Sequence, residues 1–554
     1  MEHLQQRRYL VSFDTSLIPQ VFTDVLVVGS GIAGLSAALS AARHADVLVI
    51  AKSDAADNNT CVAQGGIAAA LSAEDSPRAH MEDTLAVGQG LCEPEAVRAI
   101  TSEGPARVRE LIALGAEFDR EGASLALTRE GGHSAARIAH ARGDATGREV
   151  ETTLLRAVQR SPRIRIVEHA FAIDLVTSDG DECRGALIHH GRHGRTVVWA
   201  KRTILATGGC GRVYRETTNP AGATGDGVAM AYRAGAELVD LEFYQFHPTA
   251  LYVAGAARAL ISETVRGEGA WLLNARGERF MPRYHEDGEL APRDAVSRAI
   301  VREIRETGHT CVYLDMRHLP AELLERRFPA IREFCAQYDI DIARDLVPVR
   351  PAAHYMIGGI RIDLDGRTSV ARLHACGETA SCGLHGANRL GSNSLLEGLV
   401  IGGRAGEAAG RAAAAEPGDA RYIRLGVSVA APRHGPLDVA DVTNSLRAIA
   451  WRDLGIERGQ FGLEEAIHMM QFWSRYVMDK EFDEAAGWEL QNMLLVARLI
   501  AEAALARTES RGVHYRTDFP ARDDATWLRR IVLRRGAPLA FVPVGAPGEG
   551  PADR

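Results

Sequence analysis

Residues 23–54, TDVLVVGSGIAGLSAALSAARHADVLVIAKSD, predict a strand, a tight turn, a helix and a second strand. The apolar run Val25–Val28 leads into Gly29–Gly34, which has the pattern G-x-G-x-x-G, and Val47–Ile50 is the second apolar run. Glycine here permits the turn and lets backbone N–H groups approach a pyrophosphate at a helix N-terminus. The stretch therefore indicates the first unit of a doubly wound α/β domain that binds a dinucleotide.

One position departs from the commonest form of this unit. After the second strand, where an acidic residue usually holds a ribose, the chain has Lys52, with Asp54 just beyond. This disfavours a plain NAD-dependent dehydrogenase.

Later glycine-bearing stretches predict a large ligand that is contacted at many points. They are NNTCVAQGGIAAA (58–70), TILATGGCGRVY (203–214), GATGDGVAMA (222–231) and CGETASCGLHGANRLGSNSLLEGLVIGGRAGEAA (376–409). The last is expected to be a loop followed by a helix, with Ser392, Asn393 or Ser394 as N-cap.

The bulk properties limit the class of protein. A length of 554 residues predicts two to four domains, and a net charge of −8 without charge blocks disfavours nucleic acid or an acidic membrane as the main partner. The eight scattered cysteines have no zinc-like spacing and predict reduced thiols in a cytoplasmic protein with no metal site. Asp24 and three glycines interrupt the apolar stretch 21–42, so we expect no membrane span, and Asp14 interrupts the stretch after Arg7-Arg8, so we expect no export signal.

Several long motifs together resemble the flavoprotein family of succinate dehydrogenase, fumarate reductase and L-aspartate oxidase. They are AQGGIAAA, QFHPT, RGEGAWLLN, HYMIGG, GANRLGSNSLLEGLVIGGRAG and SRGVHYRTDFP, and the resemblance extends from Asp24 to Asp524. It implies a doubly wound α/β FAD-binding domain with an inserted α+β capping domain and a C-terminal helical domain. We expect the FAD-binding domain at 1–240 and 356–425, the capping domain at 241–355 and the helical domain at 426–554, with helices at Leu463–Met478 and Trp488–Thr508.

The resemblance also implies which residues contact FAD. They are Gly29, Ser30, Gly31, Ile32, Ala33, Gly34, Lys52, Asn59, Thr60, Cys61, Val62, Ala63, Gln64, Gly65, Gly66, Asp226, Glu378, Ser394 and Leu395. Family members with covalently attached flavin carry a histidine four residues before the alanine of AQGG, where this chain has Asn59. Asparagine cannot form that linkage, so FAD is expected to be non-covalent.

Substrates of this family are small dicarboxylates, and the motifs supply matching residues. His247, Ser262, His354 and Arg389 match carboxylate-binding positions, and arginine and histidine give charge-assisted hydrogen bonds to carboxylates. Arg293 matches the arginine that exchanges a proton with substrate. Because free arginine is a poor base, it needs help, and Glu263 and Arg266 match the residues that relay protons to it.

The residue type at the position of Glu130 distinguishes the members of the family. In LTREGGHS (127–134) it stands where succinate and fumarate enzymes typically carry phenylalanine and L-aspartate oxidases carry an acid. Aspartate differs from succinate by an ammonium group, whose burial without a partner costs several kcal/mol. Glu130 is therefore expected to hold that group in catalysis, and the alternative is a surface ion pair with Arg129 or Arg137.

The resemblance thus implies FAD-dependent oxidation of L-aspartate to iminoaspartate, with O2 or fumarate as acceptor, as the first step of NAD biosynthesis through quinolinate. It also suggests a functional link to quinolinate synthase. The first alternative is a soluble fumarate reductase or a succinate dehydrogenase flavoprotein subunit. The second is a non-catalytic FAD-binding assembly or sensor protein, which would not need His247, Ser262, Arg293, His354 and Arg389 together.

Overall fold

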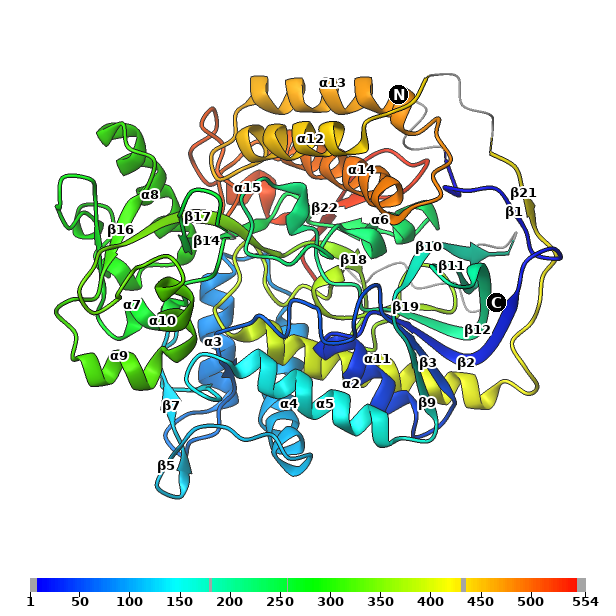
Figure 1. Ribbon diagram of the computed structural model, residues 1–554, viewed down its shortest axis with the longest axis horizontal. Helices are drawn as coiled ribbons and strands as arrows, with labels where there is room; N and C mark the ends of the chain where they lie inside the picture. Colours follow the sequence, from blue (N-terminus) through cyan, green and yellow to red (C-terminus); the bar gives the residue numbers. More distant parts are fainter. Residues whose placement is uncertain (1–6, 179–181, 257, 430–434, 546–554) are drawn as a thin grey trace.

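The opening stretch folds as expected in the computed structural model, which describes residues 7–178, 182–256, 258–429 and 435–545 (Figure 1). Strand β2 (Gln20–Val28), helix α2 (Ile32–Ala41) and strand β3 (Val47–Ile50) follow one another, and β2 pairs with β3 in parallel. The predicted strand, turn and helix are therefore confirmed.

This unit lies at the centre of a seven-stranded sheet. The other strands are β9 (Ile164–Val167), β10 (Ala170–Thr177), β11 (Cys183–His190), β12 (Gly194–Leu205) and β19 (Leu373–Ala375). The order is β10-β11-β12-β2-β3-β9, with β19 beside β12. Val25 and Val27 belong to one hydrophobic core, and Leu26 and Val28 belong to another. Because successive side chains of a strand point to opposite faces, the sheet is buried on both sides.

Helix α11 (Asn393–Ala415) packs unusually closely against α2. A Cβ atom added at Gly402 would lie 2.5 Å from the carbonyl oxygen of Ala33, and one at Gly406 would lie 2.1 Å from that of Ala37. The sequence had suggested that the glycines of 376–409 contact a ligand. For Gly402 and Gly406 that interpretation is wrong, because these positions are filled by the backbone of α2.

A separate unit extends from the sheet at the left of Figure 1, in green. Its sheet has the order β14-β17-β16-β15, and its side chains form a hydrophobic core of their own. Its elements are β14 (Tyr244–Leu251), α7 (Glu263–Gly267), β15 (Trp271–Leu273), α8 (Arg293–Thr307), β16 (Val312–Asp315), α9 (Ala321–Arg327), α10 (Pro329–Ala336) and β17 (Val347–Met356).

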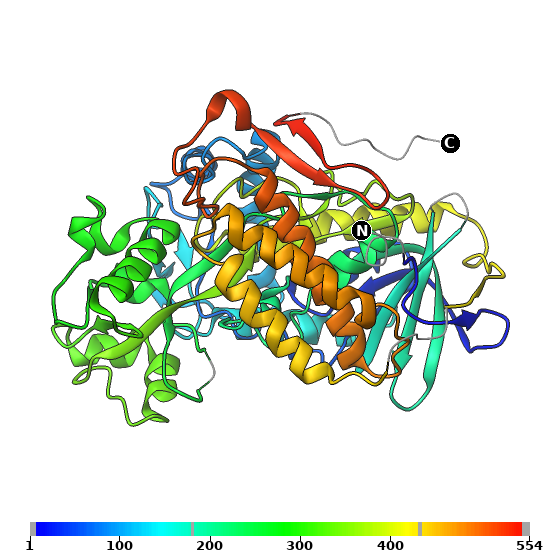
Figure 2. The same ribbon diagram turned by 90° about the horizontal axis from the view of Figure 1, so that it is seen from above.

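Three helices of the C-terminal part lie side by side across the molecule, as Figure 2 shows. They are α12 (Val439–Asp453), α13 (Gln460–Val477) and α14 (Ala485–Ala506). The two helices expected from apolar periodicity are present, with ends shifted by one to three residues. The C-terminal part also contains a hairpin, which joins the sheet β20-β18-β13-β22-β23. The strands of that sheet are β13 (Leu238–Val239), β18 (Gly359–Arg361), β20 (Ala380–Ser381), β22 (Arg529–Leu533) and β23 (Ala540–Pro543).

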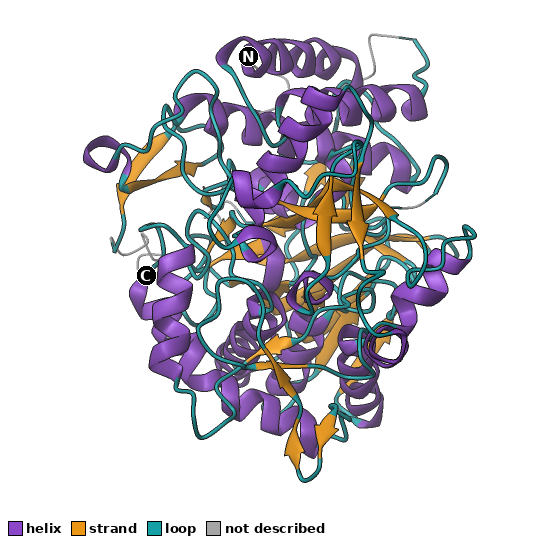
Figure 3. Cartoon of the chain, turned by 90° about the vertical axis from the view of Figure 1, so that its left-hand side faces the viewer, coloured by secondary structure: helices purple, strands orange, loops and turns teal. Residues whose placement is uncertain are grey.

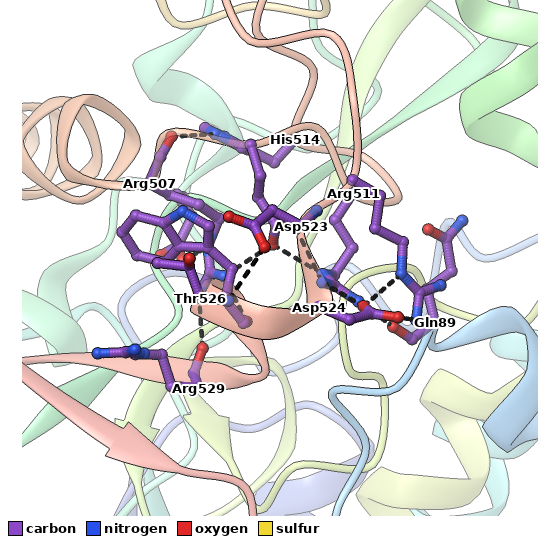
Figure 4. A network of polar contacts seen from close by, with 12 residues as sticks. Gln89, Arg507, Arg511, His514, Asp523, Asp524, Thr526 and Arg529 are labelled. Carbon is purple, nitrogen blue, oxygen red and sulfur yellow. Dashed lines mark hydrogen bonds and ion pairs between the residues drawn. The ribbon is translucent and has the colours of Figure 1, made fainter.

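A buried ion-pair network explains where α14 ends. Arg507 leaves the helix, and its guanidinium pairs with Glu242 at 2.7 Å and Glu509 at 3.1 Å, all of them without exposed side-chain surface. Glu509 also pairs with Arg511 at 2.7 Å. Figure 4 shows Arg507 directed towards the carbonyl of Arg529 and Arg511 between Asp524 and Gln89. The SRGVHYRTDFP motif is thus a structural element that ties the C-terminal part to the rest.

Figure 3 shows most strands in the interior with helices around them. The remaining elements pack around the sheets and helices described above. They are α3 (Pro77–Val87), α4 (Pro94–Ala113), α5 (Thr146–Arg160), α6 (Asp226–Arg233), α15 (Asp524–Trp527) and the short strands β1 (Phe13–Asp14), β4 (Ile67–Ala68), β5 (Arg120–Glu121), β6 (Ser124–Leu125), β7 (Leu127–Thr128), β8 (Ile138–Ala139) and β21 (Gly426–Val427). Within the described ranges, no helix has the length and apolar character needed to cross a membrane.

Candidate active site

One long cavity of about 1790 Å³, counting the part open to solvent, brings the predicted site residues together. Its walls come from the central sheet, from the β14–β17 unit and from the loop before α11. Every predicted site residue lines it except Gly34, Cys61 and Arg266. A volume of this size can hold a dinucleotide and a small second molecule together.

The glycine turn forms one end of the cavity. A Cβ atom at Gly29 would lie 2.1 Å from the carbonyl oxygen of Ala206, and Gly29 has φ +114°, which favours glycine. Gly34 does not face the cavity; a Cβ there would lie 2.0 Å from the carbonyl oxygen of Gly29, so this residue lets α2 approach the turn. The N-cap residue of α2, Gly31, has no side chain to cap the helix, and Thr60 Oγ1 accepts from the N–H of Ile32 at 3.0 Å. Gly31 lines the cavity, so an anion could approach the helix N-terminus there.

Lys52, the unexpected residue after β3, has acidic partners from elsewhere in the chain. Its Nζ lies 2.8 Å from an oxygen of Asp226 and 2.6 Å from one of Glu489. Burial opposes the charge, but the two carboxylates outweigh it and raise the pKa of Lys52. Asp226 lines the cavity at the start of α6, so an acid is present near this position although it does not follow the strand.

The middle of the cavity carries hydrogen-bonding groups that fit FAD. The Nδ2 of Asn59 donates to Glu378 at 3.1 Å, and Glu378 also accepts from the backbone N–H of Met356 at 3.0 Å. Burial raises the pKa of Glu378 to about 7. The Oδ1 of Asn59 and the Oε1 of Gln64 are buried and have no partner among the described residues. Buried acceptors need donors, and FAD offers ring N–H and ribityl hydroxyl groups. Cys61 lies off the cavity, where its N–H donates to Asn58 at 3.1 Å.

Two neutral histidines face the other end of the cavity. His247 on β14 and His354 on β17 lie with ring centroids 5.1 Å apart. Burial, together with nearby arginines, holds the pKa of both imidazoles well below the usual value. The Nδ1 of His247 accepts from the backbone N–H of Thr249 at 3.2 Å, so the proton of the neutral ring is on Nε2, which has no protein partner within the described part. His247 therefore presents a donor to a ligand.

Gln245 was missed by sequence reasoning, although it joins the two arginines of this end. Its Oε1 accepts from Nη1 of Arg293 at 3.1 Å and from Nε of Arg389 at 3.2 Å. Arg389 also donates to Ser394 at 2.9 Å and lies 4.3 Å above the ring of Tyr355. Gln245 precedes His247 by two residues on β14, so strand alternation in QFHPT could have indicated it.

Arg293, Glu263 and Arg266 form the chain of groups that the resemblance implied. The Nε of Arg293 lies 2.6 Å from Glu263, and Nη2 of Arg266 lies 3.5 Å from the other oxygen of Glu263. Burial disfavours the Glu263 carboxylate, but Arg293 and Arg266 outweigh it and lower the pKa of Glu263. Arg266 lies behind Glu263 and away from the cavity, as the outer member of a proton relay would.

Glu130 is a buried carboxylate that forms no ion pair with any of the described residues. It is 3% exposed and lines the cavity, and no ion pair within 4 Å joins it to an arginine or lysine of the described residues. Burial, and then the neighbouring Glu263, raise the pKa of Glu130. The alternative of a surface pair with Arg137 is wrong, because Arg137 is buried and pairs with Asp75 and Asp83.

The start of α11 contributes to this end of the cavity. Ser392 occupies the N-cap position with φ +62°, as one of three predicted candidates, but its side chain makes no capping bond. Its hydroxyl donates instead to Oε2 of Glu130 at 2.8 Å. Asn393 points away and contacts His80 at 2.8 Å.

Comparison with known proteins gives matches over nearly the whole chain. A family described as "FAD binding domain" matches residues 24–395, and one described as "Fumarate reductase flavoprotein C-term" matches 443–544. The chain is 46% identical to an L-aspartate oxidase of Streptomyces coelicolor over 93% of this chain and 92% of that protein. It is 42% identical to an L-aspartate oxidase of Pseudomonas aeruginosa, over 90% and 95%. Among solved structures, the FrdA chain of E. coli quinol fumarate reductase superposes with a TM-score of 0.86 at 31% identity, over 97% of this chain and 99% of that chain.

Proposed function

The chain belongs to the flavoprotein family of succinate dehydrogenase, fumarate reductase and L-aspartate oxidase and has FAD as its cofactor, and from this premise we propose that it oxidises L-aspartate to iminoaspartate. The observation that carries the proposal is Glu130, a buried carboxylate in the cavity wall that has no ion-pair partner within the described ranges. A buried charge is expected to have a partner, and the ammonium group of aspartate would supply it.

The remaining groups at this end suit two carboxylates. Arg389 can bind one carboxylate as a charged donor, and His247 and His354 can add neutral donors. Ser262 adds a hydroxyl from the N-cap of α7. Together with Glu130 they would fix a molecule with two negative ends and one positive group, which describes aspartate.

When bound, FAD would supply the two-electron acceptor for this chemistry, with O2 or fumarate as the final oxidant. Arg293 would lie beside the reacting carbons and exchange protons through Glu263 and Arg266. The raised pKa of Glu130 suits it to accept a proton from the ammonium group as the amine becomes an imine.

Fumarate reduction alone is the second candidate, supported by the fold shared with the E. coli enzyme. The carboxylate-binding residues suit both reactions. Glu130 favours aspartate, because an additional buried negative charge would disfavour a dicarboxylate that has no positive group. The convergence of charged groups on one cavity also favours an enzyme over a binding scaffold.

We further propose a cytoplasmic location and a functional link to quinolinate synthase, which would consume the unstable imine. All eight cysteines are free, as expected for a reducing compartment. We also propose that residues 241–355 act as a capping domain, supported by the separate core of this unit.

An aerobic assay of peroxide release by the FAD-loaded protein tests the proposal, with L-aspartate, D-aspartate, L-glutamate and succinate as substrates. Peroxide from L-aspartate alone is the expected result. Turnover of succinate without turnover of L-aspartate would overturn the proposal in favour of a dicarboxylate dehydrogenase.

A further inference from the structure

Two hydroxyl groups hold the carboxylate of Glu130, one on each oxygen. Thr264 Oγ1 donates to Oε1 at 3.1 Å, and Ser392 Oγ donates to Oε2 at 2.8 Å. Both hydroxyls come from residues more than 130 positions away in the chain. An ionised carboxylate can only accept hydrogen bonds, so both contacts favour the charged form of Glu130.

Thr264 reaches Glu130 from outside the substrate cavity. A second, smaller cavity is lined by Thr128, Arg129, Glu130, Thr264, Gly267, Glu268 and Leu290. Glu130 lines both cavities, whereas Thr264 lines only the second. A change at Thr264 therefore leaves the substrate space intact and acts through the residues that Thr264 contacts.

Thr264 also connects Glu130 with Ser262. The two hydroxyl oxygens of Ser262 and Thr264 are 3.1 Å apart. Because the Thr264 hydroxyl donates its one hydrogen to Glu130, its oxygen can only accept a hydrogen bond from the Ser262 hydroxyl. One hydroxyl thus links the proposed ammonium-binding group to a proposed carboxylate-binding group.

We propose that Thr264 is a specificity-determining positioning residue, which holds Glu130 in the orientation and charge state that select dicarboxylates carrying an amino group. The proposal rests on the proposed function, since it assigns Glu130 to an ammonium group. It adds a residue that lines the second cavity and not the substrate cavity.

Several charged groups near Glu130 influence its pKa. They are Glu263 and Arg266 on α7, Arg293 on α8, and Arg129 and Glu268 around the second cavity. Loss of the Thr264 hydroxyl removes one bond to the charged form while these groups stay in place. The ionised fraction of Glu130 then falls at a given pH, so aspartate binding should need a higher pH.

The experiment compares T264V, which has nearly the same shape without the hydroxyl, with T264S, which keeps the hydroxyl. T101V serves as a matched control, because Thr101 is a buried threonine of α4 whose hydroxyl donates to the carbonyls of Val97 and Arg98 in its own helix. For each FAD-loaded protein, kcat and KM are measured from pH 6 to 9 for L-aspartate oxidation and for fumarate reduction with a reduced viologen dye.

T264V is expected to raise the KM for L-aspartate about 10- to 100-fold, the range for a lost hydrogen bond to a charged group. The acid limb of its aspartate pH profile should move to higher pH, and T264S and T101V should resemble wild type. The KM for fumarate should change less than about threefold, since only a weak secondary contact through Ser262 is affected.

An unchanged KM for L-aspartate in T264V, equal losses for both substrates, or a T264S as impaired as T264V would each overturn the proposal. If T264V fails to fold or to retain FAD, T264A carries the same comparison without the added methyl group. A wild-type protein that does not oxidise L-aspartate would overturn the proposed function itself, and this inference with it. Normal wild-type activity with an unaffected T264V would overturn the inference alone.

Discussion

Replacing Glu130 by glutamine is the sharpest test of substrate choice. Glutamine keeps the size of the side chain, and its amide can still pair with the hydroxyls of Thr264 and Ser392, so the fold should be retained. The change removes a charge that is 3% exposed and forms no ion pair within 4 Å in the part of the chain that the structure describes. What it removes, on the proposed function, is the partner of the substrate's ammonium group.

The size of the effect follows from burial. Removing one partner of a buried ion pair costs about 3–5 kcal/mol, because the other charge is left without compensation. At about 1.4 kcal/mol per factor of ten, kcat/KM for L-aspartate should fall about 140- to 3,700-fold. Fumarate has no ammonium group, so its reduction should be unchanged or slightly improved by the loss of a nearby negative charge.

The assay measures peroxide release from L-aspartate and fumarate reduction with a reduced dye on the same FAD-loaded preparation. Glu464→Gln, on the exposed face of α13, is the matched control and should behave as wild type in both assays. Wild-type activity on L-aspartate should also fall with decreasing pH, and this fall should occur at a higher pH than the usual carboxylate pKa. The reason is that burial raises the pKa of Glu130, and the ionised form is lost as pH falls through that pKa. Equal losses in both reactions of E130Q would refute the assignment of Glu130 to the ammonium group.

Three further predictions concern the cofactor and stability. Acid precipitation should leave FAD in the supernatant, because Asn59 stands where covalent attachment needs a histidine and its amide bonds to Glu378; a yellow pellet would contradict this. Burial raises the pKa of Glu151 from near 4.5 to about 8, so the folded protein should lose stability as pH rises through this range, by at most about 5 kcal/mol. Glu151→Gln should therefore raise the melting temperature more at pH 9 than at pH 5, and equal gains at both would contradict the assignment. Glu509→Gln should lower the free energy of unfolding by about 3–5 kcal/mol in urea titrations, because two buried arginines lose a shared partner; a loss below about 1 kcal/mol would show that the network contributes little.

Local sequence patterns were sufficient for the central elements. The glycine turn with its flanking strand and helix depends on backbone freedom at Gly29 and on apolar runs, which are properties of neighbouring residues. Helices α13 and α14 follow from apolar spacing for the same reason. Periodicity does not determine where a helix ends: α14 ends at Ala506, and the next residue, Arg507, pairs with Glu242 from a distant segment.

The gathering of the site residues was expected from motif resemblance rather than from pattern. Gly34 and Arg266 were expected to have roles at the site but lie outside the cavity wall, since the first packs helix against turn and the second stands behind Glu263. Gln245 and Thr264 were absent from the prediction because neither carries a charge, and only strand alternation with His247 could have indicated Gln245. Their importance depends on which groups lie within hydrogen-bond distance after folding.

The sequence by itself thus determined the dinucleotide turn, the apolar periods and the presence of an acid at position 130, because each depends on residue type and near neighbours. Only the tertiary structure decided what that acid does. Arg137, seven residues along, was an obvious partner for Glu130, yet folding pairs Arg137 with Asp75 and Asp83. Glu130 is left to Thr264 and Ser392, and desolvation there raises its pKa, so that a ligand cation would stabilise the charged carboxylate. Ion pairing and desolvation depend on segments that meet only in the folded chain, which is why this part of the site could not be derived from local sequence.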